Sequence, residues 1–112
     1  MSSEYGVLIY DKPDADRRKF FKEHIAGIAP MVNSGVIKVA GAIFKDETRT
    51  KVVGSSIQLA ANSKEEAIEL LKKDAFYVNG IWDLDNAVIT SIATAVRIPK
   101  KFPGTNEELY KL

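Results

Sequence analysis

The sequence predicts an α+β domain whose elements follow the order β-α-β-β-α-β, the split βαβ or ferredoxin-like arrangement. Two observations support this prediction. Strand-forming segments and segments with helical periodicity alternate in that order, and a chain of 112 residues has room for one modest core. We expect residues 1–98 to form the domain and residues 99–112 to form a polar C-terminal tail.

The first strand and the first helix occupy the N-terminal part of the chain. Alternating apolar residues predict a strand over Glu4–Tyr10, and Asp14–Asn33 has the periodicity of an amphipathic helix. Asp14 and Asp16 lie in the first turn of this helix, where carboxylates interact favourably with the helix dipole. Because Pro30 has no amide proton, we expect a kink or break of the helix near Gly27–Pro30.

A β-hairpin is expected after this helix. Ser34-Gly35 closes the helix, because glycine readily adopts the left-handed conformation found at helix C-termini. Val36–Phe44 and Thr50–Ala61 are rich in strand-forming residues. The short polar segment between them predicts the turn of the hairpin.

A second helix and a last strand complete the order. Ser63 and Glu66 have the spacing of a capping box, in which the hydroxyl and the carboxylate bond first-turn amides reciprocally. This helix is expected to run to about Lys73. The next segment, residues 74–82, is aromatic and predicted to be irregular, and Ala87–Arg97 is predicted as the last strand.

Apolar residues on both faces of one strand predict a dimer. The strand over Val36–Phe44 is expected to be an inner strand, with Ala40 and Ala42 on one side and Val39 and Ile43 on the other. Two helices cover only one face of such a sheet, and a large exposed apolar face is unusual in a soluble monomer. We therefore expect a homodimer with the two sheets packed face to face. The alternative is a solvated face rich in alanine and threonine.

The composition argues against several classes of function. The net charge of +1 provides no general attraction to nucleic acid or to a membrane surface. The predicted third strand, residues 51–58, lacks the aromatic side chains on which RNA-recognition domains stack bases. With no cysteine and one histidine, we expect no disulfide, no thiol nucleophile and no metal site. Since we find neither a signal-peptide pattern nor a membrane-spanning stretch, we expect a cytoplasmic protein.

His24, the only histidine, lies on the apolar face of the expected first helix. A buried imidazole needs hydrogen-bond partners for both ring nitrogens. Histidine is also the side chain whose charge changes near neutral pH without any perturbation. One interpretation is a core histidine whose nitrogens are satisfied by its neighbours. The other is a general acid or base, which needs a partner that fixes its tautomer.

Three residues are candidates for the neighbours of His24. Asp74 follows the second helix, which packs on the same sheet face as the first, so its carboxylate can reach a ring nitrogen; alternatively it caps backbone amides. Ser55 follows Gly54, where a ligand can approach the backbone, and its hydroxyl orients a substrate or water, or bonds a neighbouring carbonyl. Arg17 is a candidate clamp for a carboxylate or phenolate, or lies in solvent.

The order and spacing of several short segments resemble the YCII-related (YciI-like) family. The resemblance extends from about Tyr5 to Trp82 and depends on the whole set rather than on any one segment. Its parts are His24, Gly35 eleven residues later, Ala40-Gly41, Gly54-Ser55, Ser63–Ala67 and Asp74–Gly80.

This resemblance implies a ferredoxin-like subunit that forms a dimeric α+β barrel. It also implies a His–Asp dyad at His24 and Asp74, with Ser55 and Arg17 beside it. Similar proteins include lyases, such as a dehydrochlorinase acting on a chlorinated hydroxyquinol, and muconolactone isomerases share the barrel. The chain departs from the family pattern at Phe21, where many members have an arginine.

The residues and the resemblance together favour a cofactor-independent enzyme acting on a small cyclic or aromatic molecule. His24 would be the general base or acid and Asp74 its orienting partner. Ser55 and Arg17 would position the substrate for elimination, isomerisation or hydrolysis. The alternative is a dimeric module that binds a small ligand without turnover. Three aromatic side chains are expected to wall the pocket, namely Phe76, Tyr77 and Trp82.

Overall fold

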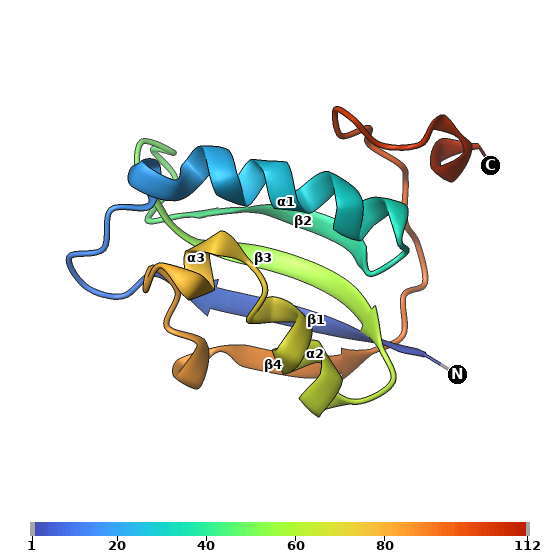
Figure 1. Ribbon diagram of the computed structural model, residues 1–112, viewed down its shortest axis with the longest axis horizontal. Coiled ribbons are helices and arrows are strands. Elements are labelled where there is room, and N and C mark those ends of the chain that lie inside the picture. The colour runs from blue at the N-terminus through green and yellow to red at the C-terminus, as the bar shows by residue number, and fades with distance from the viewer. Residues whose placement is uncertain (1, 112) are drawn as a thin grey trace.

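The computed structural model describes residues 2–111 and has the predicted α+β, ferredoxin-like fold (Figure 1). Within this range, none of the helices is both long enough and apolar enough to cross a lipid bilayer. The antiparallel sheet consists of β1 (Ser3–Tyr10), β2 (Ile37–Phe44), β3 (Val52–Ala61) and β4 (Val88–Ile92). The helices are α1 (Phe21–Asn33), α2 (Lys64–Leu71) and α3 (Ala75–Val78), with short 3-10 helices η1 (Arg17–Phe20), η2 (Leu84–Asn86) and η3 (Glu107–Tyr110).

The strand order of the sheet is β2-β3-β1-β4, and every neighbouring pair is antiparallel. β1 and β3 are therefore the inner strands, with Val7 opposite Ile57 near the centre. β2 lies at the edge, so the prediction that residues 36–44 form an inner strand is wrong. The crossover through α1 carries the chain past one strand position, which β3 fills after the hairpin turn.

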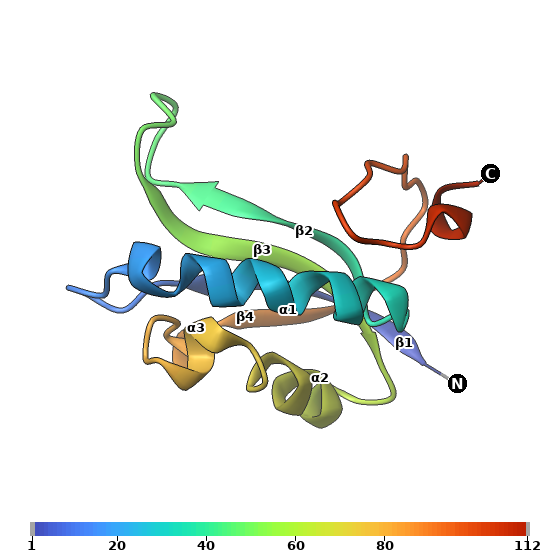
Figure 2. The ribbon, with the colours of Figure 1, turned by 45° about the horizontal axis from the view of Figure 1, so that its top comes forward.

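The α-helices all cover the same face of the sheet, and the core lies between them and the inner strands (Figures 1 and 2). Alternate residues of β1 and β3 point into this layer, as the two-residue period of a strand requires. Burying one large side chain of this kind contributes about 1.5–3 kcal/mol to folding. The core consists of Val7, Ile9, Ile57, Leu59, Ala61, Ala67, Leu71, Phe76, Ile81 and Trp82.

The opposite face of the sheet is not covered by a helix (Figures 1 and 2). It carries exposed apolar side chains. Leu8 and Tyr10 of β1 are 40% and 51% exposed, and Val88 opposite Leu8 on β4 is 56% exposed. Val39 on β2 is 42% exposed. We call these four residues and the strands that bear them the open face. The homodimer that would cover it stays a prediction.

The first helix starts later than the sequence predicted. Asp14 has a positive φ of 64°, which is incompatible with a first helical turn. The Asp16 side chain instead accepts a hydrogen bond from the Arg18 amide and caps the single 3-10 turn η1, which leads into α1 at Phe21. The two aspartates therefore precede the helix or cap its first turn, and a helix over residues 14–33 is wrong at its N-terminus.

α1 does not break at Pro30 but continues to Asn33. The proline lies near the C-terminus, so only a short stretch of helix follows the missing hydrogen bond. The helix ends as expected at Gly35, whose φ is +82°. The Gly35 amide donates to the Val32 carbonyl at 3.0 Å and the Val36 amide donates to the Met31 carbonyl at 2.9 Å, which is the Schellman arrangement.

The capping of α2 and the elements after it also differ in part from the prediction. The Ser63 hydroxyl accepts from the Glu66 amide at 3.1 Å as predicted, whereas the Glu66 carboxylate accepts from the Asn62 amide. Residues 74–82, predicted to be irregular, contain the short helix α3, and β4 is shorter than the predicted strand over residues 87–97. An aromatic run with one capping aspartate carries little periodicity, which explains why α3 was missed.

Gly54 serves the sheet rather than a ligand. A Cβ atom at this position would lie 2.5 Å from the Ile9 carbonyl oxygen and 3.2 Å from the Tyr10 Cα on the neighbouring strand. Glycine therefore allows β1 and β3 to approach closely here. This contact explains the glycine without the expected approach of a ligand to its backbone.

We predict that Gly54→Ala lowers the free energy of unfolding by about 1–3 kcal/mol, because the added methyl group forces the inner strands apart. Urea denaturation followed by Trp82 fluorescence measures this. The control is Gly41→Ala on β2, where a Cβ atom meets nothing within 4 Å. A Gly54→Ala protein as stable as the Gly41→Ala protein would contradict the prediction.

Candidate functional site

The structure brings His24 and Asp74 into direct contact. His24 lies on α1, and its Nδ1 is 2.8 Å from Asp74 Oδ1 and 2.9 Å from Asp74 Oδ2. The two side chains are 12% and 17% exposed. Asp74 also caps α3, because its Oδ1 accepts from the Phe76 amide at 2.8 Å. Both interpretations of Asp74 therefore hold at once, since one carboxylate contacts the imidazole and caps the helix.

Two buried aromatic rings fix the orientation of the His24 ring. The imidazole stacks on Phe76 with ring centroids 3.9 Å apart and an interplanar angle of 12°. Trp82 meets it edge-on, at 5.8 Å between centroids. Phe76 and Trp82 are 0% and 1% exposed, so neither ring has room to move. The imidazole is held by stacking on one side and by a carboxylate at Nδ1.

The Nε2 atom of His24 is the nitrogen available for chemistry. Within residues 2–111 it has no protein hydrogen-bond partner, and no buried side-chain nitrogen or oxygen in that range lacks one, so Nε2 is open to solvent. Contact with a carboxylate places the proton on Nδ1. A neutral His24 then presents a lone pair at Nε2, and a protonated His24 presents a donor there.

Arg17 lies inside the site rather than in solvent. Its Nε and Nη2 donate to the two carboxylate oxygens of Asp11 at 2.8 Å and 3.0 Å, and Nη2 also contacts Ser55 Oγ at 3.2 Å. The guanidinium lies over the Phe76 ring, 4.7 Å from its centroid. The side chain is 14% exposed, so the solvent interpretation of Arg17 is wrong. Asp11 thus fixes the guanidinium by a bidentate ion pair.

Ser55 presents a hydroxyl proton to the site. Its Oγ accepts from Trp82 Nε1 at 3.1 Å and from Arg17 Nη2 at 3.2 Å. A hydroxyl has two acceptor positions and one proton, so both acceptor positions are in use. No acceptor within residues 2–111 takes the proton, and the expected bond to a neighbouring carbonyl is absent there. The Ser55 O–H group is therefore a free donor.

A cavity of about 170 Å³ joins these groups, and we call it the inner cavity. A dry cavity of roughly 150 Å³ accommodates one benzene molecule, so the inner cavity fits a single-ring compound. Its polar groups are His24, Asp74, Arg17 and Ser55. The other lining residues are Phe21, Ile25, Ile28, Ile37, Ala40, Gly41, Ala42, Ile57 and Phe102.

The three aromatic residues expected in the wall of the pocket lie elsewhere. Phe76 and Trp82 are buried behind the His24 ring and are not among the residues that line the inner cavity. Tyr77 is 37% exposed on α3 and does not line it either. Phe76 faces the core from α3, and Trp82 comes after that helix and is held by its isolated bridge to Asp11, whereas Tyr77 lies on the outer side of α3.

Sequence reasoning missed two residues of the site. Asp11 directly follows the predicted first strand and lies six residues before Arg17, and an acid at the end of an inner strand close to an arginine is a signal for such an ion pair. Phe102 comes from the tail, and no periodicity in that segment predicts its contact with the inner cavity. Across residues 2–111, we find no cluster of histidine, cysteine and acidic side chains suited to hold a metal ion.

The chain belongs to the YCII-related family. The family model of the YCII-related domain matches residues 3–86, which include β1 through η2 and most of the site. This result confirms the family that the spacing of the short segments suggested. The tail, and with it Phe102, lies outside the matched range.

Curated relatives with similar sequences come from fungi. Fusaric acid biosynthesis protein 2 of Gibberella fujikuroi is 33% identical over 86 residues, which cover 71% of this chain and 83% of that protein. Aspercryptin biosynthesis cluster protein B of Emericella nidulans is 35% identical over 106 residues, which cover 88% of this chain and 68% of that protein.

One solved structure has a similar fold. It is the 5-chloro-2-hydroxyhydroquinone dehydrochlorinase from Burkholderia phenoliruptrix AC1100 in complex with 2,5-dihydroxybenzoquinone, with a TM-score of 0.64 and 21% identity. The match covers 77% of this chain and 89% of that chain. At this level of identity the comparison establishes the shared fold.

We predict that Asp74→Ala lowers the free energy of unfolding by more than Ser63→Ala does. Each substitution removes an N-cap, which costs about 0.5–2 kcal/mol, but only Asp74 also contacts His24. Asp74→Asn keeps a capping oxygen and should stay within about 1 kcal/mol of the unsubstituted protein. Urea denaturation of the three variants measures the differences, and equal losses for the two alanine variants would contradict the coupling.

Proposed function

We propose that this YCII-related protein is an enzyme for a small cyclic or aromatic compound, in which His24 and Asp74 transfer a proton. The proposal rests mainly on one observation. The Nδ1 atom of His24 lies 2.8 Å from Asp74, while the Nε2 atom, which has no partner among residues 2–111, belongs to a residue that lines a cavity of about 170 Å³. A core histidine with both nitrogens satisfied would not have this geometry.

His24 is placed to act as a general base. Nε2 takes a proton from a carbon or oxygen atom of the bound ring, and the Asp74 carboxylate stabilises the imidazolium that forms. The same proton then returns to another atom of the ring in an isomerisation, or leaves with the departing group in an elimination. In a hydrolysis, the proton comes from a water molecule instead. Each route balances without a further reactant beyond water.

Ser55 and Arg17 are placed to stabilise negative charge on the substrate. The free hydroxyl proton of Ser55 and the guanidinium of Arg17 lie together at the inner cavity, 3.2 Å apart from Nη2 to Oγ. When a base removes a proton from a hydroxylated or carbonyl-bearing ring, charge accumulates on a ring oxygen. Donors held in place before the reaction stabilise that charge without reorganisation.

The comparisons support a ring-shaped substrate. The dehydrochlorinase of similar fold acts, by its name, on a chlorinated hydroxyhydroquinone and was solved with a dihydroxybenzoquinone. Both are single-ring compounds, which is the size that the inner cavity accommodates. The fungal relatives are named for roles in biosynthesis, which is compatible with chemistry on a small molecule.

A dimeric module that binds a small ligand without turnover is the second candidate. It is favoured by the structural role of the His24–Asp74 pair, since Asp74 caps α3 and His24 stacks on Phe76. Those contacts would stabilise the fold even if His24 transferred no proton. Saturable binding without product formation is the result that this candidate predicts.

We predict that His24→Gln lowers turnover by about 10²–10⁴-fold, the usual contribution of a positioned proton-transfer group. The assay uses a panel of halogenated hydroquinones and small lactones and follows halide release or ring absorbance. Glu23→Gln, the preceding residue on α1, is the control and should keep full turnover because it does not line the inner cavity.

Two results would contradict the enzymatic proposal. The first is a His24→Gln protein that folds and keeps full turnover. The second is an unsubstituted protein that binds members of the panel, seen as thermal stabilisation, and forms no product from any of them. The second result would favour the ligand-binding module.

We further propose that two copies pair through the open face. Its exposed apolar residues include Leu8 on β1 and Val88 opposite it on β4. Burial of such a face against an identical one removes apolar surface from both copies, at roughly 25 cal/mol per Å². In a symmetric pair, one interface covers the open faces of both copies.

We predict that light scattering gives a mass twice the 12.4 kDa of one chain, and that Leu8→Lys reduces it to that of a monomer. Val78→Lys is the matched control, because Val78 is 68% exposed but lies on α3, on the other side of the sheet. Either a monomeric unsubstituted protein or a dimeric Leu8→Lys variant would refute the pairing.

A further inference from the structure

The tail after β4 is docked on the C-terminal half of α1, beyond the edge formed by β2 (Figures 1 and 2). Gly104 has a φ of +83°, and a Cβ atom there would lie 3.7 Å from the Cβ of Ala29 on α1. The Asn106 amide donates to Asn33 Oδ1 at 2.9 Å. The tail therefore contacts α1 at two points, although it lies outside the matched family range.

Hydrogen bonds within the tail hold Phe102 in place. The Phe102 amide donates to the Tyr110 hydroxyl at 3.1 Å, and the Thr105 hydroxyl donates to the Phe102 carbonyl at 2.6 Å. Tyr110 and Thr105 contact each other at 2.6 Å through their hydroxyl oxygens. Both backbone groups of Phe102 are thus engaged, which fixes the position from which its ring extends.

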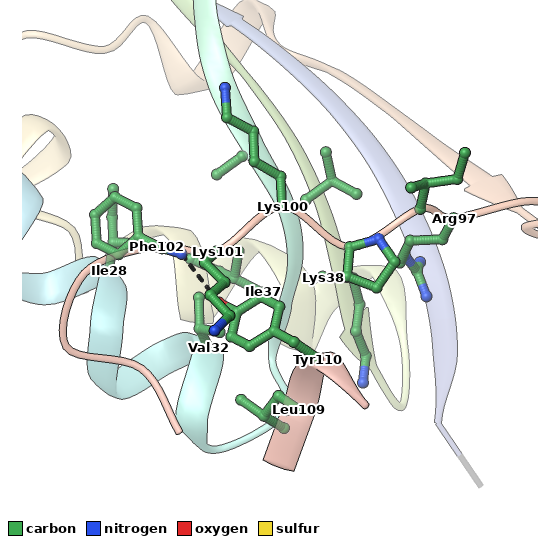
Figure 3. Close-up of a pocket in the computed structure, with 15 residues that line it drawn as sticks. Ile28, Val32, Ile37, Lys38, Arg97, Lys100, Lys101, Phe102, Leu109 and Tyr110 are labelled. Atoms are coloured by element: carbon green, nitrogen blue, oxygen red, sulfur yellow. Dashed lines mark hydrogen bonds between the residues drawn. The ribbon is translucent and has the colours of Figure 1, made fainter. Parts of the chain in front are cut away.

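Phe102 forms part of the wall of two cavities. One is the inner cavity beside His24, and the other is a cavity of about 520 Å³ under the tail, which we call the outer cavity (Figure 3). In Figure 3 the Phe102 ring lies next to Ile28 of α1. The two cavities share Ile28, Ile37, Ala40 and Phe102, so they are neighbours along β2 and α1.

The outer cavity combines apolar walls with basic side chains. Its apolar side chains come from α1, β2 and the tail, and none of the residues that line it is acidic. Arg97 and Lys101 are each paired with a glutamate, whereas Lys38 and Lys100 have no ion-pair partner within residues 2–111. The basic residues are Lys38, Arg97, Lys100 and Lys101.

One end of the outer cavity carries a net positive charge. Lys38 and Arg97 extend toward the same end in Figure 3, while Lys100 extends from the other side. Burial raises the pKa of Glu4, but hydrogen bonds from Arg97 and Thr94 and the charges of Arg97 and Lys38 outweigh it, so this pKa lies below its usual value. A single carboxylate thus faces two cations, and one positive charge is left unbalanced.

We propose that the outer cavity extends the ligand site of the inner cavity, with Phe102 as the wall between them. It takes a chain-like substituent that ends in a carboxylate or a similar anion, attached to the ring beside His24. This rests on the proposed binding of a ring compound in the inner cavity. That cavity has space for one ring only, so a longer substituent must pass Phe102. There it meets apolar walls and then Lys38 or Lys100.

NMR titration of the labelled full chain tests this with three probes: phenol, 4-phenylbutyrate and the neutral 4-phenylbutyramide. We expect the acid to bind more tightly than the amide, with shifts at Phe102 and Lys38. The preference should fall by about two- to fivefold for each of Lys38→Gln and Lys100→Gln, the usual range for an exposed charge pair. Lys45→Gln, on the β2–β3 turn outside both cavities, is the control.

A second variant tests the wall. Phe102→Ala joins the two cavities, so we expect it to increase the affinity for 4-phenylbutyrate relative to phenol. Leu109→Ala removes an apolar residue that lines the outer cavity alone and should leave that ratio unchanged or lower it. If the affinity for 4-phenylbutyrate relative to phenol does not rise in Phe102→Ala, Phe102 is not the wall between the two cavities.

The outcomes separate this proposal from the proposed function. Equal binding of acid and amide, a preference that survives both glutamine substitutions, or no binding of either chain probe overturns the outer site. Phenol binding in such a case leaves the proposed function standing. A lysine-dependent preference for the acid without phenol binding supports the outer site, and it counts against the ring site beside His24.

Discussion

The carboxylate of Asp74 is the interaction on which the site depends. It contacts the imidazole of His24 on α1 and the Phe76 amide in the first turn of α3, so one side chain joins two helices that are distant in sequence. A partly buried carboxylate is costly unless donors surround it. Here an N–H group of the imidazole and a backbone amide both donate, and such charge-assisted bonds are among the stronger ones in proteins. The fold of α3 and the geometry of the imidazole are therefore coupled.

The aromatic layer beneath this pair links it to a second set of donors. Phe76 lies under both the imidazole and the guanidinium of Arg17, and Trp82 donates to Ser55 while it meets the imidazole edge-on. These rings are completely buried, so they act as rigid supports rather than as contacts for a ligand. The supporting bonds use Nδ1 of the imidazole and both acceptor positions of the serine hydroxyl, so within residues 2–111 two groups keep free positions. These are Nε2 of the imidazole and the serine proton.

The sequence predicted local features well, and it predicted contacts only where the topology fixed them. The order of elements followed from periodicity, and because both helices of that order pack on one face, Asp74 was able to reach His24, a contact that the family resemblance implied. The edge position of β2 and the late start of α1 were not predicted, since strand apolarity does not encode order and capping by Asp16 competes with helix extension. Asp11 and Phe102 were missed because their contacts join segments without a shared pattern.

The alternation of β3 keeps the candidate site apart from the open face. Ser55, Ile57 and Leu59 point toward the helices, while Ser56 and Gln58 between them point to the opposite face. Because this two-residue period is strict, a side chain substituted on one face does not point into the other face. The inner cavity lies on the helical side of the sheet. The tail contacts the same side through α1. Pairing of two copies through the open face would therefore leave both inner cavities outside the contact, whereas Val39 places part of the outer cavity's wall at that face. The shape of the inner cavity is then a property of a single chain, set by the helices, the sheet and Phe102 of the tail rather than by a partner.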